Sequence, residues 1–132
     1  MALQLRKSEQ PYYQTKSKPV KRGSYLSFLH SLPCVVTGTR DRIEAAHISF
    51  ANPKLGHYGR GKGTKAPDRW AIPVCADEHR RSHSMNEAEY WRSAGINPHL
   101  IALVIFGLWS DLGDEAAEKA EAVIRAVARQ EA

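Results

Sequence analysis

Histidines recur at four-residue spacing in the stretch from Trp70 to His83, which reads W-A-I-P-V-C-A-D-E-H-R-R-S-H. If the chain is helical past Val74, then Cys75, His79 and His83 lie on one stripe of the helix. Two imidazoles four residues apart can bind one metal ion, because their ring nitrogens converge over one turn. The alternative is a surface helix with solvated histidines, which this spacing alone does not exclude.

The residues before these histidines predict a strand. Trp70, Ile72 and Val74 alternate with smaller residues, which is the period of a half-buried strand. Pro73 has no backbone N–H to donate, so the strand should lie at the edge or the end of a sheet. We therefore expect a short strand that passes directly into the helix with His79 and His83.

A second pair of segments is expected earlier in the chain. Cys34–Gly38 is predicted as a strand or knuckle, and 43–48 as a strand with Glu44 and His47 near its end. A turn at 38–41 would join them as a β-hairpin. This places His47 where the chain enters the loop that follows.

The histidines in these segments suit phosphodiester hydrolysis. That reaction needs a base that deprotonates water and a cation that stabilises the developing charge. His47 is our candidate base, because a neutral imidazole accepts a proton near pH 7. His79 and His83 are the candidate ligands of the cation.

The loop from Ala51 to Lys65 carries glycines interleaved with basic residues. Backbone N–H groups and cations in such a loop can contact phosphate. A plain surface loop is the alternative, although loops of this length inside compact domains are often functional. The residues that we predict to contact nucleic-acid phosphates are Arg60, Lys62, Lys65, Arg69, Arg80 and Arg81.

The charge of the chain agrees with a polyanionic partner. The 132 residues carry a formal net charge of +5, and residues 1–22 hold six basic residues against the single acid Glu9. A basic region of this kind suggests nucleic acid, although solubility explains a net charge of this size about as well. We expect a disordered basic arm at 1–23, one domain at 24–110 and an amphipathic helix at 111–132.

Four helices are expected around the two segments that carry the histidines. Ser24, Asn86 and Asn97-Pro98 are helix-start signals, and Pro33 and Gly95 are stop signals. The expected helices are 24–32, 86–92, 99–109 and 114–130.

The cysteines and the apolar runs bear on where the protein works. Two cysteines far apart and no signal peptide suggest a reducing compartment, so we expect a cytoplasmic protein. The most apolar run, 100–109, is too short to span a bilayer. Cys34 and Cys75 are expected in the core.

Residues 32–98 resemble the HNH (ββα-metal finger) nucleases, and more narrowly the phage and prophage recombination-enhancement (Ref-like) nucleases. The resemblance rests on Leu32-Pro33-Cys34, Glu44-Ala45-Ala46-His47, Gly61-Lys62-Gly63, the run from Pro67 to Cys75, His79, His83, Ser84-Met85-Asn86-Glu87 and Gly95-Ile96-Asn97-Pro98. It implies a DNA endonuclease that uses a divalent metal ion, Mg²⁺ or Mn²⁺ with Zn²⁺ also compatible. In such an enzyme His47 would activate water, and His79 and His83 would bind the metal. A recombinase filament would be a possible partner; nothing in the sequence fixes the oligomeric state.

The chain departs from this pattern at its metal sites. Thr37 and Glu78 stand where many relatives have the second cysteine of each C-x-x-C pair. A structural zinc is therefore not expected on Cys34 and Cys75 alone, because such sites need four good donors; Glu78 or His30 could complete one.

The other two departures concern the catalytic centre. Ala46 replaces a usual metal ligand, which leaves Glu44, Asp41 or His47 as the possible third ligand. Asp68 is the nearest substitute for the middle Asn of HNH, with a catalytic role in holding the loop through a side-chain to backbone bond.

The sequence therefore predicts an α+β protein, a small ββα-metal finger with flanking helices. The leading hypothesis is a metal-dependent DNA endonuclease. The alternatives are a catalytically weakened HNH-fold DNA-binding module and, less favoured, a structural-zinc interaction module.

Overall fold

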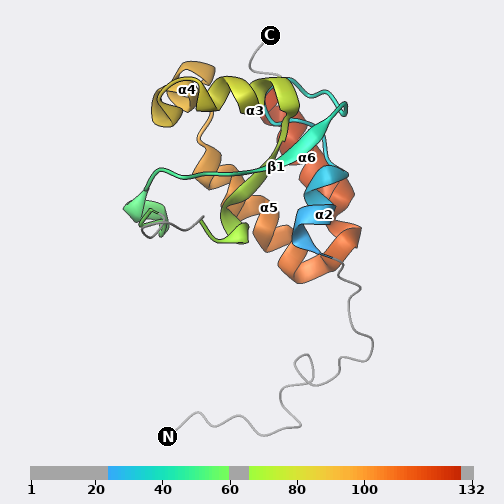
Figure 1. Cartoon of the computed structure of the whole chain (residues 1–132). Helices are drawn as coiled ribbons and strands as arrows, with labels where there is room; N and C mark the ends of the chain where they lie inside the picture. The colour runs from blue at the N-terminus through green and yellow to red at the C-terminus, as the bar shows by residue number, and fades with distance from the viewer. Residues whose placement is uncertain (1–23, 60–65, 129–132) are drawn as a thin grey trace, which may run out of the picture.

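A computed structural model of the chain describes residues 24–59 and 66–128. Its two strands, β1 (Ile43–His47) and β2 (Ala71–Cys75), form one antiparallel sheet, and the remaining elements are helical. The described part thus confirms the predicted α+β class (Figure 1). The α-helices are α2 (Tyr25–His30), α3 (Ala76–His83), α4 (Glu87–Ala94), α5 (Pro98–Leu112) and α6 (Ala117–Ala128), and the 3₁₀ helices are η2 (Pro53–Leu55), η3 (Asp68–Trp70) and η4 (Gly113–Ala116).

The predicted hairpin between Cys34–Gly38 and the strand at 43–48 is wrong. Residues 35–37 form a turn, because the Cys34 Sγ accepts the backbone N–H groups of Val36 and Thr37 at 3.4 and 3.5 Å. β1 pairs instead with β2, which follows the basic loop. The register places Ile43 opposite Cys75 and His47 opposite Ala71.

β2 is more buried than its alternating pattern predicts. All five of its residues are buried, because α2, α3 and α5 all contact the strand. Pro73 lies opposite Ala45, and its carbonyl accepts the backbone N–H of Val35 at 3.0 Å. In a two-stranded sheet each strand has one open edge, which is where the missing N–H of a proline costs least.

The predicted helix starts are confirmed at three positions. The side chains of Ser24, Asn86 and Asn97 each accept the backbone N–H three residues further on, at the starts of α2, α4 and α5. Gly95 ends α4 with φ of 74°, a left-handed conformation that glycine adopts without steric cost. These caps fix where the helices begin and end around the sheet.

The closing helix α6 packs on the same core as the sheet. Ala120 and Ile124 are fully buried, and the Arg125 guanidinium donates to the Gly38 carbonyl at 2.9 Å. Arg40 forms an ion pair with Glu121 on the same helix. α6 packs against α5 and η4, and Figure 1 shows it behind β1.

No single helix in residues 24–59 and 66–128 is long and apolar enough to cross a membrane. The stretch from α4 to α6 reaches the required length and composition only as a pair of helical segments bent by 82°.

The predicted arm at 1–23 and the loop residues Arg60, Lys62 and Lys65 lie outside the described residues.

Candidate functional site

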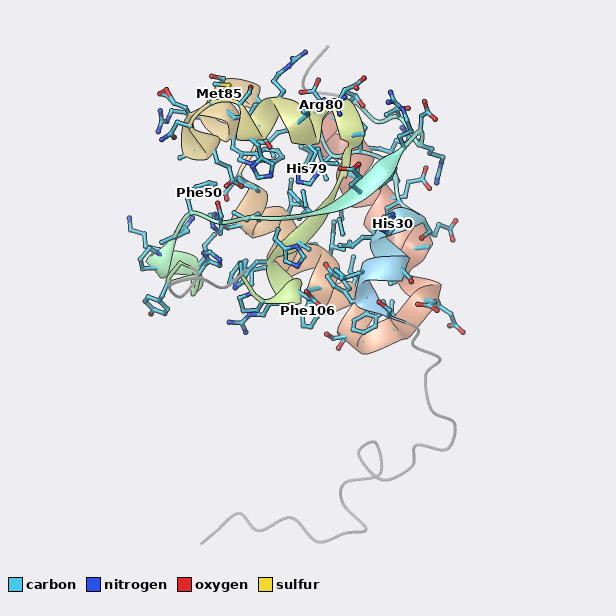
Figure 2. The ribbon with its side chains drawn as sticks, in the orientation of Figure 1. His30, Phe50, His79, Arg80, Met85 and Phe106 are labelled. Atoms are coloured by element: carbon cyan, nitrogen blue, oxygen red, sulfur yellow. The ribbon has the colours of Figure 1, made fainter. Side chains whose placement is uncertain are left out.

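Four histidines line one cleft of about 580 Å³ at the face of β1. Alternate residues of β1 and the segment after it contribute Ala45, His47 and Ser49. α2 contributes residues on one side, and α3 contributes His79 and His83. Figure 2 labels His30 on α2 and His79 on α3. The eight lining side chains, none of them acidic, are Leu26, His30, Ala45, His47, Ser49, Ala66, His79 and His83.

His79 and His83 face each other as the helical spacing predicts. Their Nε2 atoms are 3.2 Å apart. The Nδ1 of His79 lies 2.7 Å from the Glu44 carboxylate on β1. Because a carboxylate only accepts, Nδ1 carries the hydrogen, and a neutral His79 directs the lone pair of Nε2 toward His83.

This pair fits two corners of a metal coordination shell. Two nitrogens bound at roughly 2.0–2.1 Å to a tetrahedral ion are about 3.3 Å apart, close to the observed separation. A carboxylate that accepts the other ring N–H, as Glu44 does for His79, is the usual outer partner of a metal-binding histidine.

A third protein ligand is absent from residues 24–59 and 66–128, where no group of three His, Cys, Asp or Glu side chains is placed to hold a metal. Ala46, buried in β1, offers no donor. The three candidates for this role have other partners: Glu44 contacts His79, Asp41 contacts Arg42, and His47 contacts Asp68. Water or a substrate oxygen would have to complete the coordination of an ion held here.

His47 and Asp68, both predicted as catalytic, are brought together. The His47 Nε2 is 2.8 Å from an Asp68 carboxylate oxygen. The pairing of His47 with Ala71 explains this contact, since Asp68 lies in η3 directly before β2. The carboxylate must accept, so Nε2 donates and the Nδ1 of a neutral His47 keeps a lone pair.

His47 is a partner of Asp68 that was not predicted. The expected side-chain to backbone bond that holds the loop stays a prediction, because residues 60–65 lie outside the described residues. A carboxylate in this position fixes both the tautomer and the orientation of a histidine base.

Cys75 does not belong to the histidine stripe, so that prediction is wrong. It caps α3 in an extended conformation, and its side chain is buried. Cys34 is also a buried free thiol, as expected of core residues. Burial raises the pKa of the Cys75 thiol.

The two residues that could have completed a zinc site with the cysteines have other contacts. Glu78 accepts a hydrogen bond from the Tyr90 hydroxyl at 2.6 Å. His30 contacts the Ile43 carbonyl and lines the cleft.

The predicted phosphate contacts divide between different surfaces. Arg69 lies over the Trp70 ring, and Arg80 pairs with Asp77 at 2.8 Å. Arg81 lines a separate cavity that includes Glu78, so the structure does not bring it together with the histidines.

Two further histidines, His57 and His99, are buried. The sequence places His57 in the loop at 51–65 and His99 at the start of the helix at 99–109. The His99 Nε2 donates to the Phe50 carbonyl at 2.8 Å. His57 packs edge-on against Trp70 and beside His99, and neither of its ring nitrogens makes an ordinary hydrogen bond within the described residues. Burial lowers the pKa of both His57 and His99.

Of the four histidines that line the cleft, His30 is the one that the sequence did not assign to this site. It is the last residue of α2 and lies four residues after Leu26, which also lines the cleft. The sequence signal for His30 is its four-residue spacing from Leu26, which places both residues on one face of α2. No local pattern relates α2 to β1.

The comparisons with known proteins bear on the same region. The model of a family described as proteins of unknown function, DUF968, matches residues 7–106. No curated protein and no solved structure matches the chain. The matched range contains every residue that lines the histidine cleft. Since the match covers well over half of the sequence, the chain belongs to the DUF968 family.

Proposed function

We propose that this protein is a divalent-metal-dependent DNA endonuclease of the HNH type, with the histidine cleft as its active site. The observation that carries the proposal is the presence, in one cleft, of His47 held by Asp68 and the His79–His83 pair held by Glu44. One set suits proton transfer and the other suits a cation, which are the two requirements of phosphodiester hydrolysis.

His47 is the proposed general base. Its Nε2–H is held by Asp68, so its Nδ1 is the nitrogen that would take the proton of the attacking water. The Asp68 carboxylate also stabilises the imidazolium that forms, as the third group of a catalytic triad does. The side chain of His47 is about one-fifth exposed, which leaves it accessible to substrate and water.

His79 and His83 are the proposed metal ligands. A bound divalent ion would polarise the phosphate and stabilise the leaving oxygen. Two imidazole nitrogens favour Mn²⁺ or Zn²⁺ over Mg²⁺, which prefers oxygen ligands. The order β1, β2, α3, with histidines from the end of β1 and from α3, supports a ββα-metal finger.

A DNA-binding module with a weakened metal centre is the second candidate. Two observations favour this candidate. Ala46 lacks a donor atom, and no third protein ligand is present in residues 24–59 and 66–128. The two functions share the cleft and the DNA, and they differ in whether the backbone is cut.

A plasmid-nicking assay separates the two functions. Supercoiled DNA is incubated with the full chain and Mg²⁺, Mn²⁺ or Zn²⁺, each with and without EDTA. We expect nicking that EDTA abolishes and that His83→Ala reduces by at least about 100-fold, because the variant lacks one of two metal ligands.

Ser84→Ala is the matched control on the next residue. The Ser84 hydroxyl donates to the Arg81 carbonyl at the end of α3, away from the cleft, so its loss should leave nicking unchanged. Nicking at the wild-type rate by His83→Ala would contradict the metal assignment. DNA binding without nicking in any of the three metals would favour the binding module.

A further inference from the structure

His30 is held at the cleft by a single hydrogen bond. Its Nδ1 lies 2.8 Å from the Ile43 carbonyl, at the start of β1. A carbonyl only accepts, so Nδ1 carries the hydrogen and the ring orientation is fixed. The Nε2 atom has no hydrogen-bond partner among the residues that the structure describes.

The surroundings of His30 suit an anion. It lines the cleft together with His47, His79 and His83, and none of the eight lining side chains is a carboxylate. Three carboxylates accept hydrogen bonds from residues of the cleft: Glu44 from His79, Asp68 from His47 and Glu87 from Ser49. Within the described residues, no carboxylate therefore occupies the Nε2 of His30.

His30 is not placed as a third metal ligand. It comes from α2, whereas His79 and His83 come from α3, and within residues 24–59 and 66–128 no three His, Cys, Asp or Glu side chains form a metal-binding group. Because His30 is exposed, its Nε2 is open to a ligand other than the metal.

We propose that His30 is a phosphate-binding residue that holds the DNA backbone on the α2 side of the cleft. In the bound state the ring takes a proton from solvent, donates from Nδ1 to the Ile43 carbonyl and donates from Nε2 to a non-bridging phosphate oxygen. Such a charge-assisted bond is short and about twice as strong as a neutral one. The inference rests on the proposed function only in that DNA enters this cleft.

Two substitutions of His30 separate binding from a structural role. His30→Asn keeps an N–H donor near the position of Nδ1 for the Ile43 carbonyl and removes Nε2. His30→Gln does the reverse, since its longer side chain places a donor near Nε2 and gives up the bond to Ile43. Thermal unfolding midpoints of both variants check that the chain still folds.

The readout is binding of a fluorescein-labelled DNA duplex in EDTA, followed by anisotropy at about pH 6.5, where a histidine readily takes a proton. We expect His30→Asn to weaken binding about tenfold, the loss typical of one hydrogen bond to a charged group. The slope of log affinity against log salt should fall by about 0.9, the value for one phosphate contact. His30→Gln should stay within about threefold of wild type, because an amide N–H can still reach the phosphate.

Three outcomes would overturn the inference. They are wild-type affinity in His30→Asn, equal losses in the two variants, or no DNA binding by the wild-type chain. Because this assay contains no metal, it is independent of the nicking assay. A chain that binds DNA through His30 but never nicks it would refute the nuclease and leave the phosphate contact standing.

Discussion

The chemistry of the cleft depends on which nitrogen of each imidazole carries a hydrogen. Asp68 accepts from the Nε2 of His47, which leaves Nδ1 as the basic atom. Glu44 accepts from the Nδ1 of His79, which leaves the lone pair on Nε2. In the proposed nuclease, two carboxylates at different ring positions would thus prepare one histidine for proton transfer and the other for metal coordination.

This division predicts opposite effects for two isosteric substitutions. Glu44→Gln should weaken metal binding about 10- to 100-fold, the usual cost of losing the outer partner of a metal-binding histidine. Asp68→Asn should leave metal affinity close to wild type and lower the nicking rate at saturating metal, because the base loses its orienting charge. Calorimetric Mn²⁺ titration and nicking rates are measured on both variants.

Each variant serves as the control for the other. A fall in metal affinity in Asp68→Asn would show that His47 is a ligand, the role left open by Ala46. Unchanged metal affinity in Glu44→Gln would remove the reason for assigning the metal to His79.

At the scale of helices and strands, the elements that depend on local signals could be predicted from the sequence. The pairing of segments that are distant in sequence could not. The caps at Ser24, Asn86 and Asn97 fixed three helices, because capping is decided within four residues. The pairing of β1 with β2 carries no local signal, since the loop at 51–65 separates the strands in sequence. The same is true of the contact between His47 and Asp68, which follows from that pairing.

Two other differences between the predicted and the observed structure have local physical causes. Cys75 ends a strand and caps the next helix, so helical spacing does not apply to it, although it does apply to His79 and His83. The segment after Cys34 folds into a turn, in agreement with the predicted knuckle and not with a strand, because the sulfur accepts two backbone N–H groups.

Because His57 and His99 are buried, we expect the part of the fold around them to lose stability in acid. Their pKa values lie below the ordinary 6.5, because burial disfavours the charged ring. In the unfolded chain both rings take protons as the pH falls through about 6.5. The stability that the two neutral histidines contribute to the folded chain is therefore fully present above that pH. It is lost as the pH falls toward their lower pKa values in the folded state.

Urea unfolding at about pH 7.5 and at about pH 5.5 measures this loss. The urea midpoint of the wild-type chain should fall at the lower pH. In His57→Phe, which keeps a ring against Trp70 but cannot titrate, the fall should be smaller. Equal falls in both proteins would mean that His57 does not contribute to the pH dependence.

At the scale of the whole molecule, residues distant in sequence contribute to one cleft. α2, β1 and α3 supply its histidines, and residues 48–70 connect the two strands. Arg60, Lys62 and Lys65 in that segment stay predicted phosphate contacts, in keeping with the net charge of +5. The family match at 7–106 includes these residues as well as the cleft.

The most direct test of the account is the nicking of supercoiled plasmid in Mn²⁺ by the wild-type chain and by His47→Ala, prepared side by side. The account predicts that the wild-type chain nicks the plasmid and that the variant is slower by roughly 10²–10⁴-fold, the usual contribution of a general base. Because His79 and His83 are retained, the variant should still bind Mn²⁺ with near wild-type affinity. Equal nicking rates for the two proteins, or no nicking by the wild-type chain, would contradict the account.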